Sequence, residues 1–210
     1  MSIEIEDQYR IIAGSRDIQR QLLDKLEKDA RNCICNAVDI HQVYLTDEGD
    51  FETRMRAKTT LSGRSYSLTT KVKALNEGRY EYCTKIDGGA FTSFLAHAKN
   101  KTGLRKTRYT YRAQLWGETW FERLIRRIRG RELFWEIDVI YDNSPNRNPI
   151  MIRAEIEMHP DEGPVSYKFP EDLFSGCTIM CLESDDPKAH EYSNRSLSKR
   201  HDINTMLESK

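Results

Sequence analysis

Charged side chains recur at alternate positions in seven extended segments of this 210-residue sequence, often with apolar residues between them. Residues two apart share one face of a β-strand, so each segment predicts a strand with one charged face. The pairs of like sign are the acidic Glu4/Glu6, Glu136/Asp138 and Glu155/Glu157 and the basic Arg54/Arg56, Lys71/Lys73 and Lys106/Arg108. Arg79/Glu81 is a mixed pair. The alternation favours an antiparallel sheet whose apolar face is covered by other elements.

The segregation of sign separates these strands from an ordinary solvated sheet face. A single alternating strand is typical of a sheet with one face in water, where charges of both signs mix. Here whole strands are acidic or basic, although like charges at neighbouring positions repel each other. Such faces make physical sense if they converge on a polyanion that brings divalent cations. Arg and Lys bind phosphate oxygens, and paired carboxylates bind Mg²⁺ or Mn²⁺.

The order of the expected elements indicates an α+β fold. Strands are expected at residues 2–11, 39–46, 50–59, 65–74, 78–87, 104–113, 133–142 and 149–159. Helices with apolar faces are expected at residues 15–32, 88–101 and 115–130, the first capped by Ser15 or Asp17. The sequence contains no internal repeat or low-complexity linker, so a single domain spanning residues 1–210 is expected.

The composition and the first residues of the sequence bear on the cellular location of the protein and on its partners. No apolar run approaches the roughly 20 residues of a membrane span, and the acidic start, MSIEIED, lacks the features of a signal peptide. Lys and Arg together number 33, as do Asp and Glu, so the net charge gives no general attraction to nucleic acids or membranes. A cytoplasmic protein without a membrane partner is therefore expected.

The order of short motifs along the chain resembles that of the CYTH, or triphosphate tunnel metalloenzyme, superfamily. The opening segment, EIEDQYRI, resembles the family's ExExK strand. Seven further motifs follow in the family's order: the paired arginines at 53–56, LTxK at 68–71, R-x-E at 79–81, KxRY at 106–109, W-E-I-D-V at 135–139, a second ExE at 154–157 and Y-x-N at 192–194. Each motif is weak alone, but the ordered set covers nearly the whole chain.

The resemblance implies a closed antiparallel eight-stranded β-barrel with covering helices and a charged tunnel. It also implies a substrate that carries a triphosphate, either a small molecule or an RNA 5′ end, and a divalent cofactor, Mg²⁺ or Mn²⁺. The residues expected to bind the phosphates are Arg54, Arg56, Lys71, Lys73, Arg79, Lys106 and Arg108. Those expected to hold the metal are Glu4, Glu6, Asp138, Glu155 and Glu157. Those expected to act in catalysis are Glu81, Lys71 and Arg108, with Glu81 orienting water or adding a metal ligand.

Two features depart from the family pattern. Gln8 stands where the first motif of the family has a lysine, and an amide cannot neutralise a phosphate charge. Lys73, on the same face as Lys71, is a candidate replacement. The connection between the KxRY and W-E-I-D-V motifs is longer than usual, which indicates a helical insertion at about residues 114–131.

The insertion combines two tryptophans with a run of arginines. Trp116 and Trp120 share its apolar side, and the arginines are Arg123, Arg126, Arg127, Arg129 and Arg131. One interpretation is that helix 115–131 is a docking surface for RNA, for an acidic protein or for the base end of a nucleotide. The other, which we favour, is a covering helix whose tryptophans pack on the barrel while its arginines lie in solvent.

The leading hypothesis is metal-dependent hydrolysis of a triphosphate, whether inorganic, a nucleoside triphosphate or an RNA 5′-triphosphate. No His or Ser stands where a nucleophilic triad needs one, so a covalent intermediate is not expected. Nucleotide cyclisation, as in class IV adenylate cyclases, is an alternative reaction that the same charged face would serve. A further alternative is a non-catalytic binding or processing factor for nucleotides or RNA ends, which Gln8 favours.

Overall fold

A computed structural model of the chain describes residues 5–48, 51–73, 79–98, 102–142, 144, 146–158 and 167–182. Side chains are described for residues 7–46, 51–72, 80–98, 102–142, 144, 146–156 and 167–182. Of the predicted features, Glu4 and the Y-x-N segment at 192–194 lie outside the described residues. Glu6, Lys73, Arg79 and Glu157 are described by their strand positions alone.

Eleven strands and three α-helices make up the described part of the chain. The strands are β1 (Ile5–Ala13), β2 (Asn36–Glu48), β3 (Phe51–Thr60), β4 (Gly63–Lys73), β5 (Arg79–Ile86), β6 (Thr102–Arg112), β7 (Gln114–Leu115), β8 (Phe134–Tyr141), β9 (Pro149–Met158), β10 (Tyr167–Lys168) and β11 (Cys177–Leu182). The helices are α1 (Arg16–Arg31), α2 (Gly88–His97) and α3 (Trp120–Ile128), with a 3-10 helix at Glu171–Phe174. None of these helices is long and apolar enough to cross a lipid bilayer. Every predicted strand and helix has a counterpart, and β7, β10 and β11 are additional to those predicted.

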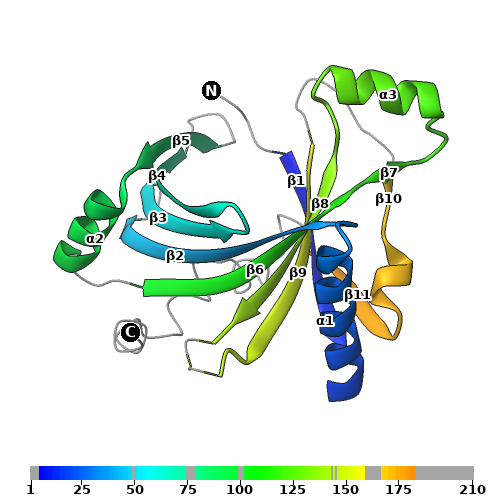
Figure 1. Ribbon diagram of the computed structural model, residues 1–210, viewed down its shortest axis with the longest axis horizontal. Coiled ribbons are helices and arrows are strands. Elements are labelled where there is room, and N and C mark those ends of the chain that lie inside the picture. Colours follow the sequence, from blue (N-terminus) through cyan, green and yellow to red (C-terminus); the bar gives the residue numbers. More distant parts are fainter. Residues whose placement is uncertain are drawn as a thin grey trace.

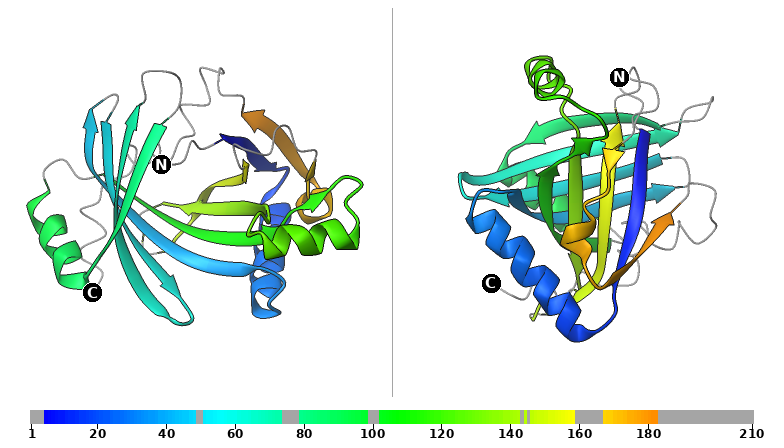
Figure 2. Two further views of the ribbon diagram at one scale, coloured as in Figure 1. Left: turned by 90° about the horizontal axis from the view of Figure 1, so that it is seen from above. Right: turned by 90° about the vertical axis from the view of Figure 1, so that its right-hand side faces the viewer.

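Nine of the strands form one antiparallel sheet, in the order β11-β1-β9-β8-β6-β2-β3-β4-β5. The sheet is strongly twisted and curled (Figures 1 and 2). The predicted α+β class with a large antiparallel sheet is confirmed. Closure into an eight-stranded barrel is not confirmed, because no hydrogen bonds among the described residues join the edge strands β11 and β5. β11 accounts for the ninth strand, since it pairs with the side of β1 that faces away from β9.

The apolar face of the sheet carries the largest hydrophobic core. Trp135 and Ile137 of β8 and Ile156 of β9 alternate with the charged residues of the same strands and are at most 1% exposed. The chain around β10 covers them: Phe174 joins the core, and the Trp135 indole N–H donates to the Lys168 carbonyl oxygen at 3.2 Å. Burying a side chain of this size contributes about 1.5–3 kcal/mol.

Two helices cover the apolar face, as the sequence predicts. α1 begins after Ser15, whose Oγ accepts the backbone N–H of Ile18 at 3.2 Å, and it buries Leu26 completely. α2 lies at the opposite end of the sheet (Figure 1) and packs Phe91 against the core around Met55 of β3. In α1 Leu22 and Leu26 face the sheet, and in α2 Phe91 and Leu95 do so, whereas Phe94 of α2 is 45% exposed.

α3 does not cover the sheet, and the predicted packing of its tryptophans is wrong. Trp116 and Trp120 are 66% and 75% exposed, and the helix buries none of its own residues. α3 stands apart from the sheet (Figure 1). It begins later than predicted, because Gly117 adopts φ +70° and Thr119 then forms a capping box with Glu122. The amphipathic spacing predicted the helix, but it did not determine what the apolar side contacts.

Candidate functional site

The face opposite the hydrophobic core is charged, and much of it is buried. Its buried polar side chains are Gln42, Glu52, Arg54, Thr69, Lys106, Asp138, Arg153 and Glu155. They occupy the strand positions that alternate with the apolar core residues, so one sheet separates the two environments. A buried charge is costly unless it is paired and hydrogen-bonded, so the partners of these side chains define the site.

Asp138 on β8 is fully buried and is surrounded by three cations. Its carboxylate accepts hydrogen bonds from Arg108 Nε at 2.7 Å and from Arg108 Nη2 at 2.8 Å. It also pairs with Lys106, and with Arg153 at 3.5 Å. The register explains the arrangement, since Arg108 on β6 and Arg153 on β9 are the direct cross-strand neighbours of Asp138. Burial alone would raise the pKa of Asp138, but the three cations lower it, so the carboxylate stays ionised.

Arg108 joins three carboxylates and is the centre of this group. Besides Asp138 it contacts Glu136 on β8 and Glu155 on β9, the latter at 3.2 Å from Nη2. Burial opposes the charge of Arg108, but these carboxylates raise its pKa above the ordinary value. Burial and the neighbouring Arg108 lower the pKa of Lys106 to about 7, so Lys106 is the cation of the group that loses its proton most readily. We call this group the Asp138 cluster, which comprises Lys106, Arg108, Glu136, Asp138, Arg153 and Glu155.

A second cluster lies on β3, β4 and β5. Lys71 Nζ lies 2.7 Å from Glu81 Oε2, and Arg54 contacts Glu81 at 3.8 Å and Glu52 at 3.4 Å. The register places Glu52, Lys71 and Glu81 opposite one another on the three strands. We call Glu52, Arg54, Lys71 and Glu81 the Glu81 cluster. Its contacts hold two predicted phosphate-binding cations in fixed positions.

Arg56 carries a positive charge that no carboxylate among the described residues pairs at ion-pair distance. Its Nε donates to Gln42 Oε1 at 2.9 Å, and Gln42 in turn donates to the Tyr44 hydroxyl at 2.5 Å. Burial lowers the pKa of Arg56 to about 10, and repulsion by Arg54 and Arg108, one from each cluster, adds to the effect. Positive charge is therefore in excess between the two clusters, which suits an anionic ligand.

The structure brings most of the predicted site residues together. The Asp138 cluster contains the predicted Lys106, Arg108, Asp138 and Glu155, the Glu81 cluster contains Arg54, Lys71 and Glu81, and Arg56 lies within the electrostatic reach of both. The other predicted positions are known by register alone, which sets Glu6 opposite Glu157 and Lys73 opposite Arg79. The phosphate-binding and catalytic roles themselves stay predictions.

Four members of the site are additional to the predicted site residues, namely Glu136, Arg153, Glu52 and Gln42. The sequence identifies Glu136 only as the alternating acidic partner of Asp138. Arg153 lies two positions before Glu155 and Glu52 two positions before Arg54, so the alternation that identified their neighbours applies to them as well. Gln42 carries no such signal, because its role depends on Arg56 of the next strand, 14 residues away.

The chemistry of the described carboxylates does not define a metal centre. Among the described side chains, no group of three or more His, Cys, Asp or Glu residues is arranged to hold a metal ion. The carboxylates of the Asp138 cluster contact arginine and lysine instead. The pairing of Glu6 with Glu157 across β1 and β9 brings two predicted ligands into register, with Gln8 opposite Glu155. The predicted metal ligands therefore stay a prediction.

Comparison with known proteins gives remote similarities. No protein-family model matches the sequence, and no curated protein matches it. Among solved structures, PH1819 from Pyrococcus horikoshii OT3 is similar at 16% identity and a TM-score of 0.44, over 80% of this chain and 84% of that chain. PH1012 from the same organism is similar at 14% identity and a TM-score of 0.45, over 76% and 80% of the two chains.

A third similar structure is described as the putative adenylyl cyclase HpAC1 from Hippeastrum, with a dominant triphosphatase activity. It has 18% identity and a TM-score of 0.43, over 74% of this chain and 80% of that chain. Because these TM-scores are below 0.5, the similarities carry no argument about this chain. The sequence resembles the triphosphate tunnel metalloenzyme superfamily, and that resemblance rests on its ordered motifs.

Proposed function

We propose that this chain is a member of the triphosphate tunnel metalloenzyme superfamily and hydrolyses a triphosphate on the charged face of its sheet. The observation that carries the proposal is the partly buried positive charge of Arg56, which lies within reach of two clusters that supply further cations. A triphosphate would supply the negative charge that the described residues lack at this point. The closed eight-stranded barrel and a cytoplasmic location are parts of the same proposal.

The cations of the two clusters are prearranged for phosphate. The proposed phosphate ligands are Arg54, Arg56, Lys71, Lys73, Arg79, Lys106 and Arg108. Carboxylates hold several of them in place, so a triphosphate exchanges one anionic partner for another with little rearrangement. Guanidinium groups contact phosphate oxygens in pairs, and ammonium groups act as point charges. These fixed charges would stabilise the charge that builds up on the transferred phosphoryl group.

Glu81 is the proposed water-orienting residue. Its carboxylate is shared by Lys71 at 2.7 Å and Arg54 at 3.8 Å. A phosphate that binds these two cations leaves the Glu81 carboxylate able to accept a hydrogen bond from an attacking water. In this arrangement Lys71 and Arg108 neutralise charge on the phosphoryl group while Glu81 holds the nucleophile.

The proposed metal ligands are Glu4, Glu6, Asp138, Glu155 and Glu157. A bound Mg²⁺ or Mn²⁺ would offset phosphate charge and lower the pKa of a coordinated water. Asp138 is suited to such a role because its neighbouring cations lower its pKa and keep it ionised. Its oxygens are shared with Lys106, Arg108 and Arg153, so these three cations would have to accommodate the ion.

The test is a substrate screen with Mg²⁺ or Mn²⁺, in which phosphate and pyrophosphate are measured separately. Tripolyphosphate, ATP and 5′-triphosphorylated RNA represent the three substrate classes. Release of phosphate from at least one of them, lost on addition of EDTA, is expected. Release of none, by folded protein with either metal, contradicts the proposal.

Two variants connect the activity to the site. Arg56→Gln is expected to lower kcat/KM by about 10²-fold or more, since it removes a fixed charge beside the phosphoryl group. Arg20→Gln, on the exposed side of α1, is the matched control and should change little. A Glu4→Gln/Glu6→Gln double variant should lose metal-dependent activity while its circular dichroism stays unchanged. If activity survives in the double variant, the metal ligands are misassigned.

Two other functions would use the same face. In a nucleotidyl cyclase a ribose 3′-hydroxyl replaces water, so ATP would give pyrophosphate together with a cyclic nucleotide. In a non-catalytic binder or processing factor, a triphosphate or RNA end would bind without turnover and without dependence on a divalent metal. Gln8, which lies opposite Glu155, favours the binder, and Gln8→Lys would restore the family's cation there.

α3 is proposed to contact the body of an RNA whose triphosphate end lies on the charged face. The exposed surface of α3 combines Trp120 and Phe121 with Arg127, and Trp116 is exposed just before the helix. Stacking of bases on aromatic rings together with cationic phosphate contacts is typical of single-stranded RNA binding. Trp120→Ser should therefore raise KM for 5′-triphosphorylated RNA but not for tripolyphosphate. An equal effect on both substrates contradicts RNA binding, and capture by an acidic protein would then be the alternative.

A further inference from the structure

A pocket of about 480 Å³ lies on the side of the sheet that faces away from both clusters. Its charged and polar lining comprises Asp39, His41, Thr59, Arg64, Arg105, Lys106, Thr107, Tyr141 and Arg147. Lys106 is the one member of a cluster among them, and its side chain pairs with Asp138 on the opposite face of the sheet. Arg105 and Thr107 alternate along β6 with Lys106 and Arg108, so their side chains lie on the opposite face of the sheet. The sheet therefore separates this pocket from the proposed triphosphate site.

Three arginines reach the pocket from separate parts of the chain. Arg105 lies on β6, directly opposite His41 of β2. Arg64 lies on β4, with its guanidinium carbon 5.6 Å from the centre of the Tyr66 ring. Arg147 lies between β8 and β9 and adopts φ +49°, a backbone conformation that side-chain-bearing residues rarely take. Only the folded sheet brings the three charges to one place.

Positive charge exceeds negative charge in this pocket. Asp39 is the one carboxylate in the lining among the described residues. Its Oδ1 accepts the Thr107 hydroxyl at 2.7 Å, and its Oδ2 lies 3.9 Å from Arg147. Burial and Arg147 lower the pKa of Arg105, and burial together with the three arginines lowers the pKa of His41 to about 4. His41 is therefore neutral at pH 7, and the three arginines against the single carboxylate of Asp39 leave about two positive charges in excess.

We propose that this pocket is a second anion-binding site, which takes a small molecule that carries a dianionic phosphate group. Guanidinium groups match phosphate oxygens, and the Thr59 hydroxyl adds a neutral donor. The volume falls in the range of small-ligand sites, so it has room for a phosphomonoester as well as for the phosphate itself. The ligand would offset the repulsion among Arg64, Arg105 and Arg147. This site does not depend on the reaction proposed for the charged face.

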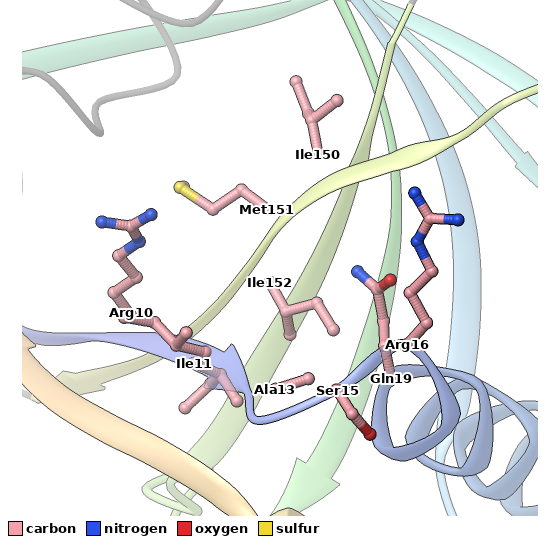
Figure 3. Close-up of a pocket in the computed structure, with 10 residues that line it drawn as sticks. Arg10, Ile11, Ala13, Ser15, Arg16, Gln19, Ile150, Met151 and Ile152 are labelled. Atoms are coloured by element: carbon pink, nitrogen blue, oxygen red, sulfur yellow. The ribbon is translucent and has the colours of Figure 1, made fainter.

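A smaller pocket lacks this convergence of charge and supplies a control. It measures about 310 Å³ and lies between β1, the start of α1 and β9. Figure 3 shows its two arginines, Arg10 and Arg16, on opposite sides with Ile152 between them. Because the two charges do not meet at one point, no anion site is proposed there. Arg16→Gln removes the same charge as a substitution in the larger pocket.

His41 lines the proposed site and reports on its occupancy. A ligand on the opposite face of the sheet does not contact His41. Protein labelled with ¹³C and ¹⁵N in histidine would be titrated with inorganic phosphate in EDTA, at constant ionic strength, and followed by NMR. The His41 ring resonances, assigned with His41→Gln, are expected to shift and reach saturation. The pKa of His41 is expected to rise, since the bound dianion offsets the surrounding arginines.

Substitutions separate this site from the charged face. Arg105→Gln and Arg147→Gln are each expected to weaken phosphate binding about tenfold, as expected for loss of a charge-assisted hydrogen bond. Arg147 lies between strands with an exposed side chain, so its variant keeps the test valid if Arg105→Gln fails to fold. Arg16→Gln and Lys71→Gln should leave the His41 response unchanged. The absence of saturation at millimolar phosphate, or a response removed by Lys71→Gln and not by Arg147→Gln, would overturn the proposal.

Discussion

The two faces of the sheet are built from the same strands but depend on different physics. On β8, Ile137 and Val139 of the apolar face alternate with Glu136 and Asp138 of the charged face. The apolar residues are stabilised by removal from water, which needs no particular partner. Asp138 is equally buried, yet it is tolerated only because it has specific cationic partners. The charged face should therefore be the more sensitive of the two to loss of a single group.

The largest expected effect tests that sensitivity directly. Asp138→Asn should lower the free energy of unfolding by about 3–5 kcal/mol, since Lys106 would keep a buried charge without its carboxylate partner and Arg108 and Arg153 would each lose one. Urea unfolding followed by circular dichroism measures the change. Asp24→Asn, on the exposed side of α1, is the control, with an expected change within about 0.5 kcal/mol. A loss below about 1 kcal/mol for Asp138→Asn would mean that the charged face is not the more sensitive of the two faces.

The second effect measures the apolar face. Leu26→Ala should cost about 2–4 kcal/mol, because Leu26 of α1 is completely buried against the sheet and its removal leaves a cavity. The same substitution at Leu124 of α3, which is 43% exposed, should cost less than about 1 kcal/mol. Equal losses in thermal or urea unfolding would mean that α3 is packed as firmly as α1.

A third effect concerns the pocket around His41, which is polar although it lies on the apolar face of the sheet. The pKa of His41 is about 4 in the folded chain against 6.5 ordinarily, so the unfolded chain binds more protons between these values. Stability should therefore fall as the pH drops from about 6.5 to 4. The groups that face His41 are Arg105 on β6, Arg64 on β4, Arg147 between β8 and β9, and Asp39 on its own strand.

The pH effect of His41 is expected to be about 2 kcal/mol between pH 7 and pH 5. Unfolding at both values, for the parent chain and for His41→Gln, isolates it from the contributions of other groups. His97→Gln, an exposed histidine on α2, should leave the pH dependence as it is in the parent. An unchanged pH dependence in His41→Gln would contradict a neutral, buried His41.

The smallest effects compare the caps of two helices. Ser15→Ala removes the N-cap of α1 and should cost about 1 kcal/mol in global unfolding, because α1 is part of the core. Thr119→Ala removes the N-cap of α3 but should change global unfolding by less than about 0.5 kcal/mol, since α3 buries no residue. Hydrogen exchange should show the Thr119 effect locally, at the amides of α3. A global cost at Thr119 would mean that α3 folds with the sheet.

Much of the sheet could be predicted because its signal has a period of two. The alternation assigned Arg54, Lys71 and Asp138 to one face, and the same pattern placed Ile137 and Ile156 on the other. Capping and helical spacing identified α1 for the same reason, since both are local. Each of these predictions depends on residues within one turn or one strand.

The features that the sequence did not predict depend on contacts between residues that are far apart in the chain. β11 belongs to the sheet only because it pairs with β1, which lies more than 160 residues earlier in the chain. The pocket around His41 is assembled from Arg64, Arg105 and Arg147, none of which marks a motif. The exposure of α3 likewise depends on contacts outside the helix. Its amphipathic pattern is the same whether its apolar side is buried against the sheet or exposed to solvent.

The placement of the three tryptophans gives the protein two separate fluorescence signals. Trp135 is 1% exposed beneath the chain around β10, whereas Trp116 and Trp120 are 66% and 75% exposed beside α3. An aqueous quencher such as acrylamide should therefore reach the two outer indoles and spare the inner one. A ligand on α3 would protect the outer pair without altering the inner signal, and unfolding would shift the emission of Trp135 to longer wavelength. One spectrum thus distinguishes occupancy of α3 from loss of the fold.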